Sequence, residues 1–98
     1  MADTTENAPT KGPSVYDLVM YMVDQWSAIS WQKLGLQPDP MTGSYDKNFA
    51  EAKVAIDLTA HLASILEPQL DEGDKRRVNG LVRDLRINYV QKSAELES

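Results

Sequence analysis

The segment from Val15 to Leu34 carries apolar side chains around most of its circumference, and no other feature of the sequence constrains the fold as strongly. At about 100° per residue, a helix here presents two apolar faces. One face holds Val15, Leu18, Val19, Met22, Trp26 and Ile29, and the other holds Tyr16, Met20, Val23, Trp31 and Leu34. Such a helix is typically buried on most sides. Two further helices of a short chain can cover only one side of it.

The start and the end of this first helix are marked by capping signals. Ser14, with Asp17 three residues later, is a variant of the capping box. Gly35 can adopt the left-handed conformation that ends a helix. Residues 37–43 contain two prolines and cannot be helical. We expect this connection to pack along a surface of the protein.

Two further helices are expected after the connection. Asp46, or alternatively Ser44, is the predicted N-cap of the second helix, and Pro68 stops this helix after Leu66. No segment shows the sustained alternation that is typical of a strand. The predicted fold is all-α, a three-helix antiparallel bundle or hairpin-like arrangement. The expected helices span residues 15–34, 46–66 and 72–92 of a single domain (14–92), between a disordered tail (1–13) and a frayed C-terminus (93–98).

The core available to this chain is thin. Leu, Ile, Val and Phe together account for 22 of its 98 residues, and chains this small often rely on disulfides, metals or oligomerisation. The absence of cysteine excludes disulfides, and the single histidine, His61, excludes a metal site with two His ligands. We therefore expect a homodimer formed through the first helix. The expected contact residues are Tyr16, Met20, Val23, Trp26 and Trp31.

An alternative explains the same helix without a second chain. The first helix can be central in its own bundle, with its aromatic side chains half exposed. A third possibility is that Trp26 and Trp31 insert into a membrane surface, although the acidic charge of the chain opposes binding to anionic lipid.

Charge is distributed unevenly along the chain, whose formal net charge is −5. Residues 1–74 have four Lys against twelve Asp or Glu, whereas residues 75–98 have a net charge of +3. The predicted third helix has a basic edge formed by Lys75, Arg76, Arg83 and Arg86. This edge could bind nucleic acid or an acidic ligand, but the acidic body of the chain disfavours a polyanion. Pairing with Asp24, Glu51 and Asp57 on neighbouring helices is the expected role.

Signals for catalysis are absent from the sequence. We find no nucleophile motif, no phosphate-binding glycine loop and no metal-ligand spacing, so we predict no enzyme activity, no cofactor and no catalytic residues. No stretch of 18 apolar residues occurs, so no membrane-spanning segment is expected. The polar, acidic N-terminus is not a secretory signal, and we expect a cytoplasmic protein.

Three motifs resemble those of a family of short bacterial proteins classed as a domain of unknown function. They are Leu34-Gly35-Leu36 with Pro38-Asp39-Pro40 and Thr42-Gly43, then Ile56-Asp57-Leu58, then Asp84-Leu85-Arg86 with Tyr89-Val90. The resemblance covers residues 14–91. It implies a small helical cytoplasmic protein and assigns no catalytic or binding residues. The opposite charges within these apolar motifs suggest that Arg86 pairs with Asp57 or Asp39.

Our leading interpretation is a non-enzymatic helical interaction or scaffold protein that self-associates through its first helix and acts on an unidentified protein partner. The alternative is an accessory protein that binds nucleic acid or an acidic ligand through the basic edge.

Overall fold

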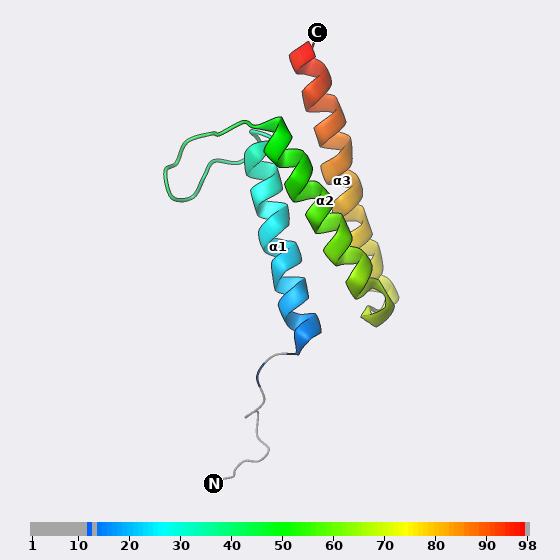
Figure 1. Cartoon of the computed structure of the whole chain (residues 1–98). Helices are drawn as coiled ribbons and strands as arrows, with labels where there is room; N and C mark the ends of the chain where they lie inside the picture. The colour runs from blue at the N-terminus through cyan, green and yellow to red at the C-terminus, as the bar shows by residue number, and fades with distance from the viewer. Residues whose placement is uncertain (1–11, 13, 98) are drawn as a thin grey trace.

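The computed structural model describes residue 12 and residues 14–97, which form an all-α bundle. Its helices are α1 (Val15–Lys33), α2 (Phe49–Leu66) and α3 (Glu72–Glu97), with a short 3₁₀ turn η1 (Glu67–Gln69) between α2 and α3. Consecutive helices run antiparallel, as Figure 1 shows. The tail predicted for residues 1–13 lies, apart from Gly12, outside the described residues.

Both ends of α1 have the predicted capping structure. The Ser14 Oγ accepts a hydrogen bond from the Asp17 N–H, and the Asp17 carboxylate accepts one from the Ser14 N–H. At the other end Gly35 has a φ of 80°, and its N–H donates to the carbonyl of Gln32. The Leu36 N–H donates to the carbonyl of Trp31. These two bonds form a Schellman motif that ends the helix.

The start of α2 differs from the prediction. The helix begins at Phe49 with Asn48 as its N-cap, whose side chain accepts a hydrogen bond from the Glu51 N–H. Asp46, the predicted cap, instead forms an ion pair with Lys33 at 2.7 Å. The Asn48 N–H donates to the carbonyl of Lys33, which keeps this backbone extended until Asn48.

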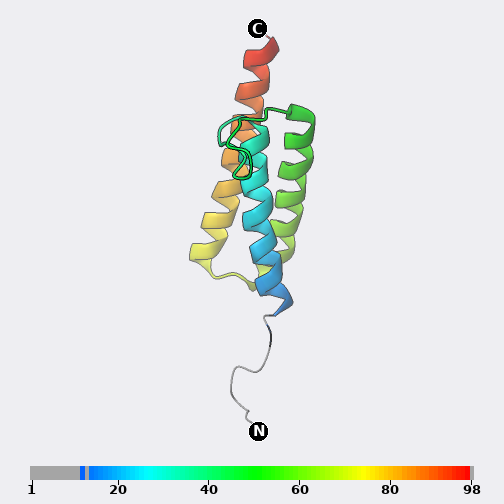
Figure 2. The ribbon, with the colours of Figure 1, turned by 90° about the vertical axis from the view of Figure 1, so that its left-hand side faces the viewer.

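The end of α3 also differs from the prediction. Residues 93–97 were expected to fray, but the helix continues to Glu97. Local interactions support these last turns, because the Ser93 Oγ donates to the Tyr89 carbonyl and Lys92 pairs with Glu95 at 3.6 Å. Figure 2 shows these turns extending beyond the ends of α1 and α2.

The core lies where α1 and α2 pack closely and α3 covers α2. Several of the buried side chains of α1 and α2 are small: Ser27 and Ser30 of α1 and Ala52, Ala55 and Ala63 of α2. The two serine hydroxyls donate to carbonyls of their own helix, so they need no partner on α2. Larger side chains fill the remaining space. They are Val23, Leu34, Ile56, Leu62, Leu66, Val78, Val82 and Leu85.

The connection between α1 and α2 projects away from the bundle (Figure 1), so the expectation that it packs along a surface was wrong. Hydrogen bonds within the connection itself hold its shape instead. The Asp39 carboxylate accepts a hydrogen bond from the Met41 N–H, and the Gly43 N–H donates to the Asp39 carbonyl. Gly43 has a φ of 74°, which closes the turn.

Candidate functional site

The side of α1 that meets the rest of the chain includes residues that we expected to contact a second copy. Of the predicted dimer contacts, Val23 is fully buried in the core of its own chain and therefore inaccessible to a second copy. Met20, Trp26 and Trp31 are partly buried and pack against the same core, while Tyr16 remains exposed.

The reason lies in residues between these side chains. Ser27 and Ser30 lie on the same face as Val23, and their small size lets α2 approach α1 closely. The face of α1 that holds Val23, Ser27 and Ser30, which we call the inner face, is therefore the one that packs against α2. Trp26 and Trp31, which we expected to contact a second copy, are packed along its edges.

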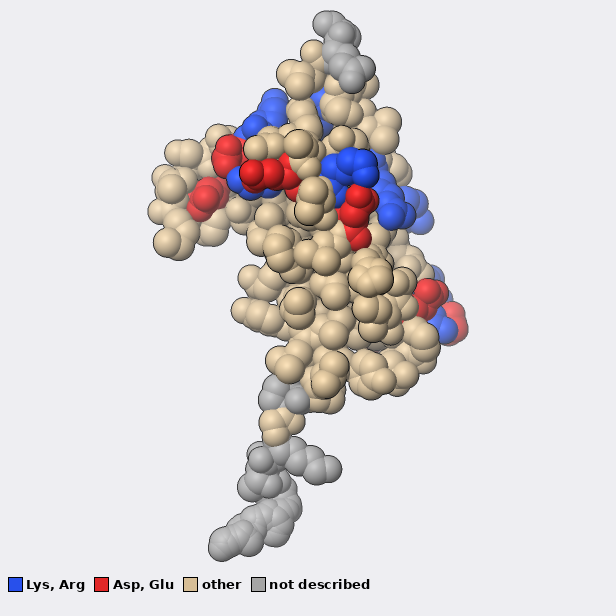
Figure 3. Space-filling model, viewed as in Figure 1, with Lys and Arg blue, Asp and Glu red and all other residues tan. Residues whose placement is uncertain are grey.

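Beside this inner face, a second side of α1 continues onto α2 as an apolar surface, which we call the outer face. Its residues are Val15, Leu18, Met22, Trp26 and Ile29 of α1 and Val54, Leu58 and Ile65 of α2. Val15 is 70% exposed, Leu18 50% and Val54 65%. Among the described residues, the lower half of the surface over α1 and α2 in Figure 3 shows no charged side chain.

A shallow pocket of about 230 Å³ lies at the charged end of the outer face. Trp26, Ile29, Val54 and Ala55 line it, together with Lys33 and Glu51. This pocket gives the outer face a depression into which an apolar side chain could fit.

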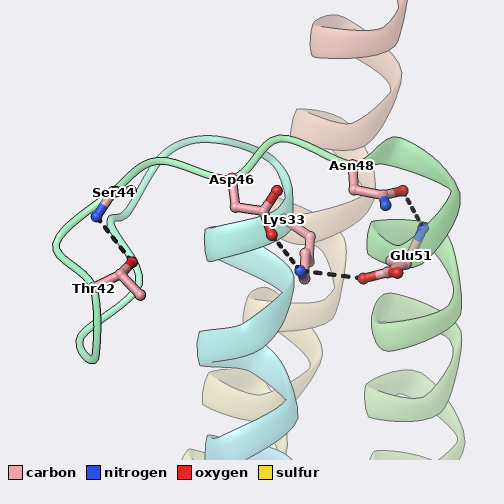
Figure 4. Close-up of polar contacts among 6 residues, drawn as sticks. All are labelled: Lys33, Thr42, Ser44, Asp46, Asn48 and Glu51. Atoms are coloured by element: carbon pink, nitrogen blue, oxygen red, sulfur yellow. Dashed lines mark hydrogen bonds and ion pairs between the residues drawn. The ribbon is translucent and has the colours of Figure 1, made fainter.

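The charges at this pocket are already neutralised within the chain. The Lys33 Nζ lies 2.7 Å from an Asp46 oxygen and 3.2 Å from a Glu51 oxygen, as Figure 4 shows. The hydrogen bond to Asp46, and then the one to Glu51, raises the pKa of Lys33 above its ordinary value of 10.5. This cluster ties α1, the connection and α2 together.

Two of the four residues of the predicted basic edge pair with acids of α3 itself. Lys75 lies 3.6 Å from Glu72, and Arg83 lies 4.0 Å from Asp84. The expected pairing with acids of neighbouring helices was therefore wrong for these two. Glu51 is taken by Lys33, as described above. Within the described part of the chain, Arg76 and Arg86 have no ion-pair partner within 4.0 Å.

A second pocket, which we call the α2–α3 pocket, has a volume of about 250 Å³. Its lining residues are Lys53, Ile56 and Asp57 of α2 and Arg86, Tyr89 and Val90 of α3. Two of the three sequence motifs that carry the family resemblance meet here. The structure thus brings together residues that lie about 30 positions apart in the chain.

The predicted ion pair between Asp57 and Arg86 does not form, although both residues line this pocket. Asp57 pairs instead with Lys53, one helical turn earlier, at 2.8 Å. This hydrogen bond raises the pKa of Lys53. The alternative partner Asp39 is engaged by the Met41 N–H. Sequence reasoning missed Lys53, although a Lys and an Asp four residues apart on a helix is a recognisable signal for a local pair.

In the part of the chain that the structure describes, no three or more His, Cys, Asp or Glu side chains are grouped so that they could hold a metal ion. The same residues include no helix long and apolar enough to cross a membrane. Among the described residues, the two pockets and the outer face are candidates for a functional site.

Comparison with known proteins identifies the family of the chain. Neither a search of curated proteins nor a search of solved structures found a match. The model of one family, described as "Domain of unknown function (DUF1844)", matches residues 15–91. This match spans all of α1 and α2 and most of α3. The chain therefore belongs to the DUF1844 family.

Proposed function

We propose that this protein is a non-enzymatic helical interaction module that self-associates through the outer face. The exposed apolar surface shared by α1 and α2 is the observation that carries the proposal. Soluble monomers rarely expose contiguous apolar patches larger than a few hundred Å². A second copy that covers this surface would remove it from water, and each buried apolar Å² contributes about 25 cal/mol before the costs of association.

The charge of the chain limits where a second copy can bind, and the outer face meets this limit. Two chains that each carry a net charge of −5 repel one another wherever their acidic surfaces meet. The uncharged part of the outer face in Figure 3 is a surface through which they can meet without placing like charges in contact. The simplest arrangement is a two-fold dimer in which the same patch of each chain is buried.

The pocket lined by Trp26, Ile29 and Val54 supports this arrangement. Hydrophobic anchors that fill pockets commonly supply most of the binding energy of an interface. If the two α1 helices cross antiparallel near Met22, Leu18 of one copy lies opposite Trp26 of the other. The exposed side chains at one end of the patch would then reach the pocket at the other end.

Light scattering coupled to gel filtration tests the proposal. At about 100 μM the wild-type protein should have a mass near twice the 11.0 kDa of one chain. The substitution Val54→Glu should return it to the monomer mass, because it places a charge in the pocket that an apolar side chain of the second copy would fill.

Val90→Glu provides a matched control. Val90 lies on α3 and is 63% exposed, almost the same as Val54 at 65%, so the two substitutions differ mainly in the surface that they change. We expect the Val90→Glu protein to remain a dimer. A wild-type mass of 11.0 kDa at all concentrations would disprove the proposal, as would equal effects of the two substitutions.

The proposed biological role is to hold or regulate a protein partner in the bacterial cytoplasm. Support for this setting comes from the lack of cysteine and from the family resemblance noted for the sequence. Binding through the whole basic edge of α3 is the less favoured alternative, because Lys75 and Arg83 already have acidic partners within α3.

A further inference from the structure

The α2–α3 pocket combines apolar and charged side chains in a way that selects a particular ligand chemistry. We infer that it binds an acidic peptide segment of a partner protein, in which a Glu or Asp lies next to a large apolar residue. This inference does not depend on self-association, because the pocket lies between α2 and α3 and shares no lining residue with the outer face.

The apolar part of the pocket consists of Ile56, Tyr89 and Val90. Ile56 is buried, whereas Val90 is 63% exposed and so remains open to a ligand. The Tyr89 ring packs edge-on against Phe49, with 6.3 Å between ring centroids. This packing places a firmly held aromatic side chain beside the charged groups, which suits the apolar side chain of a bound peptide.

The charged part of the pocket has one cation in excess. The Lys53 Nζ is 2.8 Å from the Asp57 carboxylate, so these two charges offset one another. Arg86 is exposed and has no ion-pair partner within 4.0 Å among the described residues. A guanidinium presents a planar fork of donors that matches a carboxylate in two hydrogen bonds. The group that complements this pocket is therefore an anion beside an apolar group.

Size and charge together favour a peptide over other acidic ligands. The volume of about 250 Å³ is below the range of roughly 300–1,000 Å³ that is usual for sites of small molecules and cofactors. It fits one or two side chains. A nucleic acid would bring several phosphates toward Asp57 and toward an acidic chain, whereas a peptide brings a single carboxylate to Arg86.

An NMR titration of the ¹⁵N-labelled full chain tests this inference directly. Three hexapeptides serve as probes: Gly-Ser-Leu-Glu-Ser-Gly and its matched versions with Gln or Lys in place of Glu. We expect the Glu peptide to shift the amide signals of Lys53, Asp57, Arg86, Tyr89 and Val90 at millimolar concentrations. Its affinity should exceed that of the other two by about tenfold, as is typical for a charge-assisted bond.

Substitutions identify the group that binds the carboxylate. Arg86→Gln should lower the affinity for the Glu peptide about tenfold. Arg76→Gln removes an equally unpaired arginine of the same helix outside the pocket and should leave the affinity unchanged. Val90→Glu should abolish binding by supplying a competing carboxylate, whereas Val54→Glu should not affect it.

Several outcomes would overturn the inference. They are equal binding of the three peptides, equal effects of Arg86→Gln and Arg76→Gln, no shifts at 10 mM peptide, or shifts confined to the outer face. A parallel titration with a single-stranded oligonucleotide tests whether the pocket binds nucleic acid instead. If the oligonucleotide shifts the pocket signals at lower concentration than the Glu peptide does, the site serves nucleic acid and the peptide assignment is wrong.

Discussion

The two faces of α1 are similar in apolar content but differ in their surroundings. The inner face, with Val23 and Leu34, is buried against α2 and α3. The outer face, with Val15, Leu18 and Met22, stays exposed. Both faces contain large apolar side chains at helical spacing, so hydrophobicity alone does not distinguish them.

The distinguishing feature is the size of the side chains between the apolar ones. The inner face contains Ser27 and Ser30, which are buried, as are three alanines of α2. Small residues let two helix backbones approach closely, and close approach increases the number of van der Waals contacts. Where both faces of a helix are apolar, the face with small polar residues whose hydroxyls can bond to their own helix is the better candidate for the core.

Two leucines of α1 offer the strongest way to test this difference. Leu34 is 1% exposed and Leu18 is 50% exposed. Leu34→Ala should lower the free energy of unfolding by about 2–5 kcal/mol, because it leaves a cavity in the core. Leu18→Ala should cost less than about 1 kcal/mol at submicromolar concentration. Urea unfolding measures both, and similar costs would show that the two faces have been assigned incorrectly.

Varying the protein concentration gives a further comparison between Leu18→Ala and Leu34→Ala. If Leu18 contributes to a dimer, the cost of Leu18→Ala should grow as the protein concentration rises, because only the associated form loses the contact. The cost of Leu34→Ala should not show this extra dependence.

A larger side chain at Ser30 tests the importance of close helix approach. Ser30→Leu should cost about 1–3 kcal/mol, because the added atoms have no space between α1 and α2. Ser64→Leu is the matched control. Ser64 is exposed on α2, and its hydroxyl also donates to a carbonyl of its own helix. Thermal unfolding should show a clear drop in Tm for Ser30→Leu only, and equal drops would argue against the close contact.

Gly35 directly follows Leu34, the C-cap of α1, and so fixes where the helix and both of its faces end. Gly35→Ala should cost about 1–2 kcal/mol, because the position has a φ of 80°, a conformation that L side chains rarely adopt. Gly12→Ala is a suitable comparison, since an added methyl meets nothing within 4 Å there. Chemical unfolding of both variants measures the difference, and a neutral Gly35→Ala would contradict the Schellman geometry.

The smallest expected effect concerns Lys33, the cation at the end of the outer face. Hydrogen bonds to Asp46 and Glu51 raise its pKa in the folded state above 10.5. A raised pKa stabilises the fold fully below the unfolded value and loses this contribution as the pH rises through the folded value. The stability difference between wild type and Lys33→Met should therefore shrink as the pH is raised from 9 toward 11.5. A constant difference over this range would show that the ion pairs do not contribute.

Much of the fold was predictable because its signals are local. Ser14, Asp17 and Gly35 cap α1 through contacts within a few residues, and the sequence shows such contacts directly. The start of α2 was less predictable, because Asp46 and Asn48 are both good N-caps. The choice between them depends on Lys33, 13 residues before Asp46, which takes the Asp46 carboxylate.

The candidate sites depended on packing that the sequence does not show. Helical spacing assigned Val23 and Val15 to two different apolar faces, but it could not show which face α2 would cover. Asp57 and Arg86 were predicted to form an ion pair, and the structure shows only that both line one pocket. The prediction of an ion pair between them was wrong, because Lys53, one turn away on the same helix, pairs with Asp57 instead.

Methionine methyl signals provide the most direct test of the central claim that the outer face is where two copies meet. Met20 lies against the core, Met22 is on the outer face and Met41 is in the exposed connection. With ¹³C-methyl-labelled methionine, dilution from about 500 μM to 5 μM should shift the Met22 signal, while the Met20 and Met41 signals stay fixed. A Met22 signal that does not change on dilution, in a protein whose mass remains 11.0 kDa, would contradict the account.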